Sequence, residues 1–144
     1  MNYVDVAAAT TSISNKLALY NRSGDNGTLD VKALFDRSSI LEIPGQTIEG
    51  IDAIGAFVEG RRKIALAELS AGTRARHFLG SILVTVDDGV SARAESYFLV
   101  IREGQIENFG SYRDSFRCVD GDWLIAHRKV ELHWPRPAEP PARV

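Results

Sequence analysis

The first half of the chain has the hydrophobic spacing of helices. Apolar residues recur in steps of three and four across residues 5–22, as on one face of a helix; they are Val6, Ile13, Leu17 and Tyr20. The following SGDNG, at 23–27, predicts a turn, because Gly, Asn and Asp tolerate the backbone angles that turns require. A short second helix is expected over 28–36 with Thr28 as its N-cap. A third is expected over 51–69, with a break near Gly60.

The second half alternates apolar and polar residues, as strands do. Residues 39–50 predict two short strands around a Pro-Gly turn. From residue 74, four longer segments are separated by DDG, REG and VDGD, which are typical hairpin turns. Helices followed by an antiparallel meander predict an α+β fold, with helices on one face of a curved sheet. No βαβ alternation or glycine-rich phosphate loop favours a doubly wound fold.

Alternation also assigns residues to faces of the expected sheet. In the first long strand, one face receives His77, Leu79, Ser81, Leu83 and Thr85. The other face receives Phe78, Ile82, Val84 and Val86. In the last strand, one face receives Leu124, Ala126, Arg128, Val130 and Leu132. The face that carries His77 is therefore mixed in character, and Arg128 is the one charged residue on an otherwise aliphatic face. These two residues become candidates for chemistry.

Length and composition narrow the class of protein. The 144 residues fit one domain, expected over 1–134, followed by a tail at 135–144 that holds four of the five prolines. A net charge of −2 gives no basic field for nucleic acid or an anionic membrane. No apolar stretch approaches the ~20 residues of a membrane span. A single cysteine, Cys118, and an N-terminus without a signal-peptide pattern favour a cytoplasmic location.

His77 is the leading chemical candidate, because imidazole exchanges protons near neutral pH. The alternative is a strand-end histidine bonded to a backbone carbonyl. Asp25 is the expected partner, and Asp30 competes for that role. A carboxylate bonded to one ring nitrogen fixes the tautomer and raises the basicity of the other nitrogen.

Arg128 is the second candidate, since an arginine on an aliphatic face is costly unless it is paired or binds an anion. Asp114 and Glu95 are its possible partners. Tyr112 alternates onto the same face as Asp114 and could polarise a carbonyl; the alternative for this pair is a buried hydroxyl and a salt bridge.

Other chemistry is weakly supported. The three histidines, His77, His127 and His133, lack the clustering of metal ligands, so we expect no metal site and no cofactor. No serine lies in a nucleophile-elbow sequence. Cys118 has no evident partner that would stabilise a thiolate.

Four stretches resemble the SnoaL-like branch of the nuclear-transport-factor-2-like superfamily: IEGIDAIGAFV, RHFLGSILVTV, AESYFLVI and GSYRDSFRCVDGDWLIAHRKVEL. The resemblance spans residues 5–134 and is most specific in G-x-Y-x-D-x-F, DG-x-W-x-I-x-x-R and RHF-x-G. It implies a cone of three helices packed on a strongly bent antiparallel sheet, with a pocket inside. Members include scytalone dehydratase, hexachlorocyclohexane dehydrochlorinase, polyketide cyclases and ketosteroid isomerase.

The resemblance also implies roles for residues. The Asp–His base of the dehydratase and dehydrochlorinase corresponds to Asp25 and His77, although Asp25 lies one residue off the family spacing measured from Phe35. The arginine in the dehydrochlorinase's last strand corresponds to Arg128. We therefore expect a cofactor-independent lyase or isomerase in which Arg128 stabilises negative charge and Tyr112 donates a hydrogen bond. The small apolar organic substrate would contact Tyr20, Phe57, Leu83, Phe98 and Asp114.

Two alternatives stay open at this point. The small subunit of ring-hydroxylating dioxygenases shares the family fold without doing chemistry, so this chain could be a ligand-binding or accessory protein. An epoxide-opening hydrolase would need two acids flanking an arginine, such as Asp114 and a further acid beside Arg128. The resemblance also implies a homodimer or homotrimer, with Phe78, Ile82 and Val84 on the back of the sheet.

Overall fold

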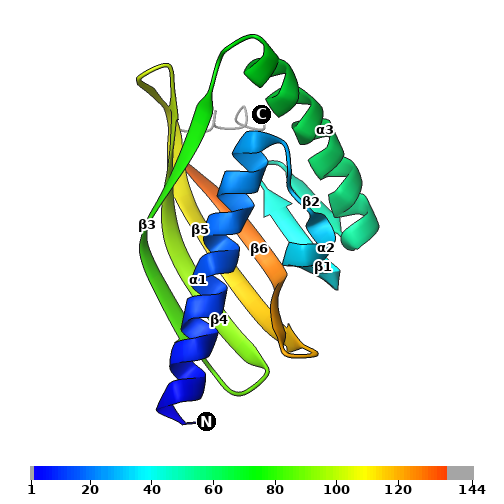
Figure 1. Cartoon of the computed structure of the whole chain (residues 1–144), viewed down its shortest axis with the longest axis vertical. Helices are drawn as coiled ribbons and strands as arrows, with labels where there is room; N and C mark the ends of the chain where they lie inside the picture. The colour runs from blue at the N-terminus through cyan, green and yellow to red at the C-terminus, as the bar shows by residue number, and fades with distance from the viewer. Residues whose placement is uncertain (1, 136–144) are drawn as a thin grey trace, which may run out of the picture.

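A curved six-stranded sheet carries the helices on its inner face (Figure 1). The computed structural model describes residues 2–135. Along the chain the elements are α1 (Tyr3–Asn26), α2 (Val31–Leu34), β1 (Phe35–Ile43), β2 (Gln46–Glu49), α3 (Ile51–Ser70), β3 (Ala75–Val86), β4 (Ser91–Arg102), β5 (Gln105–Val119) and β6 (Asp122–Trp134). The predicted α+β class is confirmed. Apart from Pro135, the predicted tail at 135–144 lies outside the described residues.

The strands follow the order β2-β1-β6-β5-β4-β3. β3 to β6 form the predicted antiparallel meander. β6 then pairs with β1 in parallel, so the expectation of a wholly antiparallel sheet is wrong at this one pair. The reason is the connection: the chain leaves β1 and returns to its side only through β2, α3 and three further strands. A connection of that length permits a parallel pair, which a tight turn cannot.

The first helix is longer than predicted. Residues 23–26, expected to form a turn, complete the last turn of α1, and the helix ends at Gly27 with φ +68°. The amide of Gly27 donates to the carbonyls of Gly24 and Ser23, and the Ser23 hydroxyl donates to the Leu19 carbonyl. These bonds satisfy the polar groups that favoured a turn. A left-handed residue packed this closely against α3 must be glycine, since a Cβ at Gly27 would lie 3.0 Å from Leu66.

The second and third helices also depart from prediction. α2 has a single turn, its N-cap is Asp30 rather than Thr28, and the Asp30 carboxylate accepts from the Lys32 amide at 3.0 Å. α3 runs through Gly60 without a break. One glycine costs a helix only about 1 kcal/mol relative to alanine, which the packing of α3 on α1, β1 and β2 offsets.

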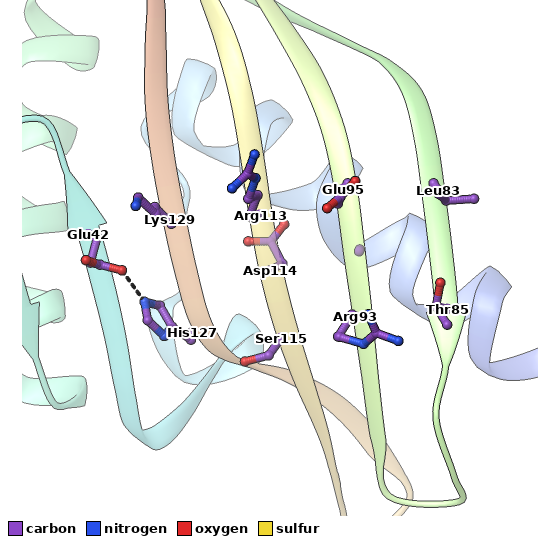
Figure 2. A pocket seen from close by; sticks show the side chains of 11 residues that line it. Glu42, Leu83, Thr85, Arg93, Glu95, Arg113, Asp114, Ser115, His127 and Lys129 are labelled. Atoms are coloured by element: carbon purple, nitrogen blue, oxygen red, sulfur yellow. Dashed lines mark hydrogen bonds and ion pairs between the residues drawn. The ribbon is translucent and has the colours of Figure 1, made fainter.

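A bulge in β3 reverses the predicted faces beyond residue 80. Gly80 pairs with Tyr97 and Leu83 with Glu95, so Ser81 and Ile82 oppose a single residue of β4. Ser81 adopts φ +49° to absorb the extra residue. His77 and Leu79 point inward as predicted, whereas Leu83 and Thr85 lie on the outer face (Figure 2). The predicted placement of Leu83 in the pocket is therefore wrong.

A second bulge acts in the same way in β6. Ser115 pairs with His127 and Phe116 with Ile125, which leaves Ala126 as the extra residue. Arg128 lies on the inner face, as predicted. Before the bulge, however, the buried residues are Trp123 and Ile125 and not the predicted Leu124 and Ala126. A one-residue slip moves every later side chain to the opposite face.

The core lies between the helices and the inner face of the sheet. Its fully buried aliphatic residues come from both layers and include Ile13, Leu17, Leu41, Ile54 and Ile125. Each such side chain contributes roughly 1.5–3 kcal/mol on burial. A separate cluster of Phe98, Val100 and Tyr112 lies on β4 and β5. Gly110 permits this packing, because a Cβ there would lie 1.9 Å from the Glu131 carbonyl oxygen and 2.9 Å from the Phe98 ring.

Candidate active site

A cavity of about 540 Å³ opens between the end of α1, α3 and the inner face of the sheet. Apolar and aromatic side chains dominate its sheet side and α3 side; they include Tyr20, Phe57, Phe98, Val100, Tyr112, Val130 and Leu132. Polar side chains converge at the end of α1, where Asn21, Asp25 and His77 line it. This size and this mixture are typical of small-molecule sites. Of the predicted contact residues, Tyr20, Phe57 and Phe98 line the cavity.

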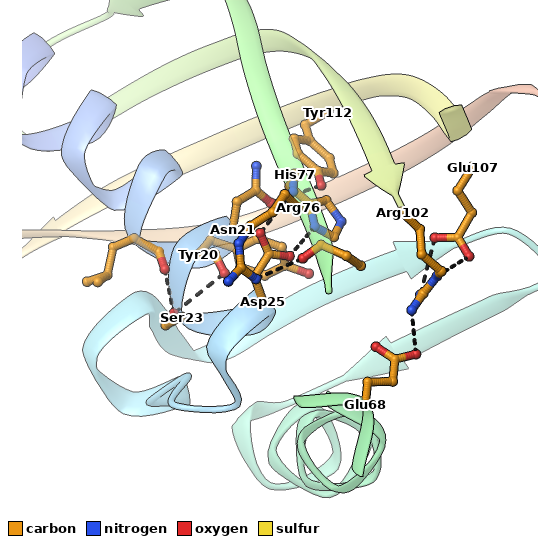
Figure 3. Close-up of polar contacts among 12 residues, drawn as sticks. Tyr20, Asn21, Ser23, Asp25, Glu68, Arg76, His77, Arg102, Glu107 and Tyr112 are labelled. Atoms are coloured by element: carbon orange, nitrogen blue, oxygen red, sulfur yellow. Dashed lines mark hydrogen bonds and ion pairs between the residues drawn. The ribbon is translucent and has the colours of Figure 1, made fainter. Parts of the chain in front are cut away.

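The predicted partners Asp25 and His77 are in contact. His77 Nδ1 lies 2.5 Å from Asp25 Oδ1, and the His77 amide donates to Asp25 Oδ2 at 2.8 Å (Figure 3). The carboxylate comes from the last turn of α1, and the imidazole from the start of β3, where His77 pairs with Val100 of β4. Asp30, the other possible partner, caps α2 instead.

The burial of this pair is asymmetric. The Asp25 side chain is 6% exposed and the His77 side chain is 31% exposed. A carboxylate on Nδ1 favours the tautomer whose Nε2 is unprotonated. Among residues 2–135, no side chain or backbone group hydrogen-bonds to Nε2. The arrangement can therefore accept a proton at a ring nitrogen that is open to a bound molecule.

Arg128 and Asp114 form a second, wholly enclosed pair. Arg128 Nε and Nη2 donate to Asp114 Oδ1 and Oδ2 at 2.7 and 2.9 Å, and both side chains are 0% exposed. The guanidinium carbon lies 4.1 Å from the ring centroids of both Tyr20 and Tyr112. Burial by itself lowers the pKa of Arg128, but the Asp114 carboxylate outweighs it and raises that pKa above its usual range.

This pair lies behind the cavity wall, not in it. Neither Arg128 nor Asp114 lines the cavity. The expectation that both contact substrate is therefore not met, because Asp114 neutralises the arginine and accepts from its Nε and Nη2, and two tyrosine rings cover it. Within residues 2–135, Asp114 is the one acid that bonds to Arg128. The two flanking acids of an epoxide-opening site are not assembled there.

Tyr112 lines the cavity and commits its hydroxyl to Asn21. The Tyr112 hydroxyl donates to Asn21 Oδ1 at 3.1 Å, and the Tyr112 ring stacks on Phe98 with centroids 4.6 Å apart. Burial raises the pKa of Tyr112 above its usual range. Asn21 escaped prediction because 23–27 was expected to be a turn. Asn21 and Asp25 are four residues apart, so they share a helix face once the segment is helical.

An ion network at the rim was also missed. Arg102 in β4 bonds to Glu68 of α3 at 2.8 Å and to Glu107 at the start of β5 at 3.0 Å (Figure 3). All three side chains line the cavity and are partly exposed. The hydrogen bonds that Arg102 donates to Glu107 and Glu68 raise its pKa. Glu107 lies five residues from Arg102 across the β4–β5 turn, whereas Glu68 is too far away in sequence for a local pattern to reveal its contact.

The sequence matches the model of the SnoaL-like domain over residues 5–129. The chain belongs to the SnoaL-like family. No curated protein matches the sequence.

Solved structures share the fold of this SnoaL-like protein, and three of them come from Novosphingobium aromaticivorans. A candidate scytalone dehydratase has 19% identity and a TM-score of 0.73, with 99% of each chain covered. A nuclear-transport-factor-2-like protein with a cystatin-like fold has 25% identity and a TM-score of 0.71, covering 94% of this chain and 93% of its own. The β subunit of a candidate aromatic-ring-hydroxylating dioxygenase has 19% identity and a TM-score of 0.68, covering 88% and 90%.

The outer face of the SnoaL-like sheet carries a second hollow of about 400 Å³. Charged side chains of both signs surround it, and they include Glu42, Arg93, Glu95, Arg113 and Lys129 (Figure 2). His127 Nε2 lies 2.5 Å from Glu42 Oε2 there, with 42% of the histidine side chain exposed. This His–Glu contact resembles the His77–Asp25 contact in distance but lies on the opposite side of the sheet.

Within residues 2–135 of the SnoaL-like chain, no group of three or more His, Cys, Asp or Glu residues is arranged to hold a metal ion. No helix in this part of the chain is both long and apolar enough to cross a membrane.

Proposed function

We propose that this SnoaL-like protein is a cofactor-independent lyase or isomerase of small, mostly apolar molecules. His77 Nε2 removes a proton from a carbon next to a carbonyl or a leaving group. The observation that carries this proposal is the imidazole held by Asp25 in the wall of a mainly apolar cavity. The fold shared with a candidate scytalone dehydratase supports the same reaction class.

In this mechanism Asp25 orients the imidazole and stabilises the imidazolium that forms. A positioned general base contributes roughly 10²–10⁴-fold to rate. Tyr20, Phe57 and Phe98 exclude water and hold the apolar part of the substrate, which strengthens electrostatic interactions in the site. Arg128 and Tyr112 act as positioning residues: the guanidinium, neutralised by Asp114, fixes the rings of Tyr20 and Tyr112 from behind.

Hydrogen–deuterium exchange tests the proposal before a natural substrate is known. A set of cyclic ketones that includes 1-indanone is incubated with the protein in D₂O, and exchange at the carbon next to the carbonyl is followed by NMR. We expect His77→Ala to lower the catalysed exchange rate about 10²–10⁴-fold while the circular dichroism spectrum is unchanged.

His127→Ala is the matched control, since it removes a histidine with a similar carboxylate contact from the outer face. It is expected to exchange at the wild-type rate. A His77→Ala variant with the full wild-type rate would contradict the mechanism.

A second candidate is a ligand-binding or accessory role, which the fold shared with a dioxygenase β subunit favours. In that case the wild-type protein would catalyse no exchange on any ketone of the set and would co-purify with a larger iron–sulfur subunit. We further propose a cytoplasmic homodimer or homotrimer whose interface includes the exposed Phe78 and Ile82 on the outer side of β3. Size-exclusion chromatography with light scattering tests the oligomeric state.

A further inference from the structure

One polar atom in the cavity wall has no partner. Asn21 is 5% exposed, its Oδ1 accepts from the Tyr112 hydroxyl, and its Nδ2 is buried without a hydrogen bond among residues 2–135. Ser96 Oγ and Arg128 Nη1 are also unpaired in that part of the chain, but only Asn21 lines the cavity. A buried donor without a partner costs free energy, so such an atom invites an acceptor from a bound molecule.

The unpaired amide lies beside the base. Asn21 and Asp25 are four residues apart on α1 and therefore on one face of it. Asp25 in turn binds His77 through both its ring and its backbone amide (Figure 3). The amide donor and the imidazole acceptor thus flank the same end of the cavity, where a carbonyl oxygen and an adjacent C–H group would meet both.

We propose that Asn21 Nδ2 donates a hydrogen bond to the carbonyl oxygen of the ligand, which makes enolisable ketones and related carbonyl compounds the preferred class. This inference rests on the proposed function. When the C–H bond breaks, the proton passes to His77 Nε2 and its electron pair becomes the carbon–carbon double bond of an enolate. The carbonyl π electrons move onto oxygen, and that oxygen accepts from Nδ2. Where the ketone carries a carbon–carbon double bond one position further along, the enolate is a dienolate; the proton returns to its far carbon, the double bond moves into conjugation with the re-formed carbonyl, and the isomerisation is complete.

Tyr112 sets the direction of the amide. Because its hydroxyl donates to Oδ1, the NH₂ group of Asn21 is the part left for the ligand. The reverse orientation would leave the amide oxygen for the ligand, and the site would then prefer alcohols to ketones. The preference of the site for a ketone or an alcohol therefore reports which end of the amide meets the ligand.

Binding of three probes of similar shape tests the inference: 1-indanone, its alcohol 1-indanol, and the hydrocarbon indane. Dissociation constants are measured by NMR titration of the full chain. The wild-type protein is expected to bind the ketone about 3- to 10-fold more tightly than the hydrocarbon, as one neutral hydrogen bond provides.

Paired variants keep the test independent of folding. Tyr112→Phe leaves the amide donor in place, whereas Tyr112→Phe combined with Asn21→Leu removes it without stranding the tyrosine hydroxyl. We expect the single variant to keep its preference for the ketone over indane, because the freed amide can still turn its NH₂ group to the carbonyl. We expect the double variant to lose that preference. Asn108→Leu, which changes another cavity-lining amide, is expected to keep it.

The outcomes separate this inference from the proposed function. His77→Ala is expected to keep the ketone preference, because it removes the proposed base and leaves the Asn21 donor in place. Loss of exchange in this variant therefore supports the proposed function and does not bear on Asn21. An unchanged preference in the double variant, or a wild-type preference for 1-indanol, would overturn the inference whatever the exchange rates are.

Discussion

Two pairs, each of one carboxylate and one basic side chain, lie on either side of one cavity wall. They differ in whether the basic group is accessible from the cavity. Asp25 holds a histidine whose side chain is 31% exposed, whereas Asp114 holds an arginine that is 0% exposed. Both contacts are short, but the first joins residues 52 apart in the sequence, whereas the second joins cross-strand partners of β5 and β6. The first leaves a nitrogen free toward the cavity, and the second is covered by the rings of Tyr20 and Tyr112.

The presence of an ion pair therefore does not by itself indicate a catalytic role. Its accessibility from the cavity and the proton affinity of its basic group distinguish a pair suited to proton transfer from one that stabilises the fold. Imidazole gains and loses protons near neutral pH, while guanidinium stays charged throughout the accessible range. Loss of Asp25 should therefore change rate, and loss of Asp114 should change stability.

Asp25→Asn is expected to reduce ketone exchange about 10²–10⁴-fold, because an amide no longer selects the tautomer with a basic Nε2. The rate is measured by NMR in D₂O. Asp30→Asn serves as control, since Asp30 caps α2 and does not contact His77. An equal loss of exchange rate in the two variants would contradict a specific role for Asp25 in orienting His77.

Asp114→Asn is expected to lower the free energy of unfolding by about 3–5 kcal/mol, because it leaves the buried Arg128 without a counter-ion. Urea denaturation measures this change. The double variant Asp114→Leu with Arg128→Met should recover most of the loss, as apolar replacements of buried pairs often do. Wild-type stability in the single variant would show that the arginine needs no internal partner.

Tyr20→Leu is expected to cost about 0.5–2 kcal/mol of unfolding free energy through loss of its contact with the Arg128 guanidinium. Tyr20→Phe keeps an aromatic face and should stay close to the wild type. If both variants were equally destabilised, the hydroxyl and not the ring would be responsible.

The smallest effect concerns alkaline pH. Burial keeps Tyr112 protonated in the fold, whereas the unfolded chain ionises this group near its ordinary pKa of 10.0. The folded state therefore binds more protons above that pH, and the contribution to stability is complete below pH 10.0 and declines as pH rises further. Urea denaturation above pH 10.0 should show a steeper loss for the wild type than for Tyr112→Phe; parallel curves would contradict this.

The sequence predicted the contact between Asp25 and His77 because both lie at ends of elements that a family pattern identifies. The prediction misplaced Leu83 because the bulge at Ser81 depends on a positive φ, which serine seldom adopts. The residue type at that position therefore gave no sign of a bulge. A single extra residue then reverses all later positions of the strand. Alternation is therefore reliable only up to the first bulge.

Asn21 illustrates a different limit of sequence reasoning. The segment SGDN has the composition of a turn, and only its hydrogen bonds to the Gly27 amide and the Leu19 carbonyl show it to be helical. The same boundary decides whether Asn21 and Asp25 share a face. The contact of Arg102 with Glu68 depends on tertiary packing from the outset, and so does the parallel pairing of β1 with β6.

Asp25 makes two hydrogen bonds to residue 77, one with the imidazole and one with the backbone amide. The second bond does not depend on which side chain occupies that position. The carboxylate therefore stays aimed at the same space when the ring is removed, for example in His77→Gly. Free imidazole from solution matches that space and its hydrogen-bond acceptor. We therefore expect it to restore ketone exchange to His77→Gly, and we expect imidazoles of other basicity to change the restored rate.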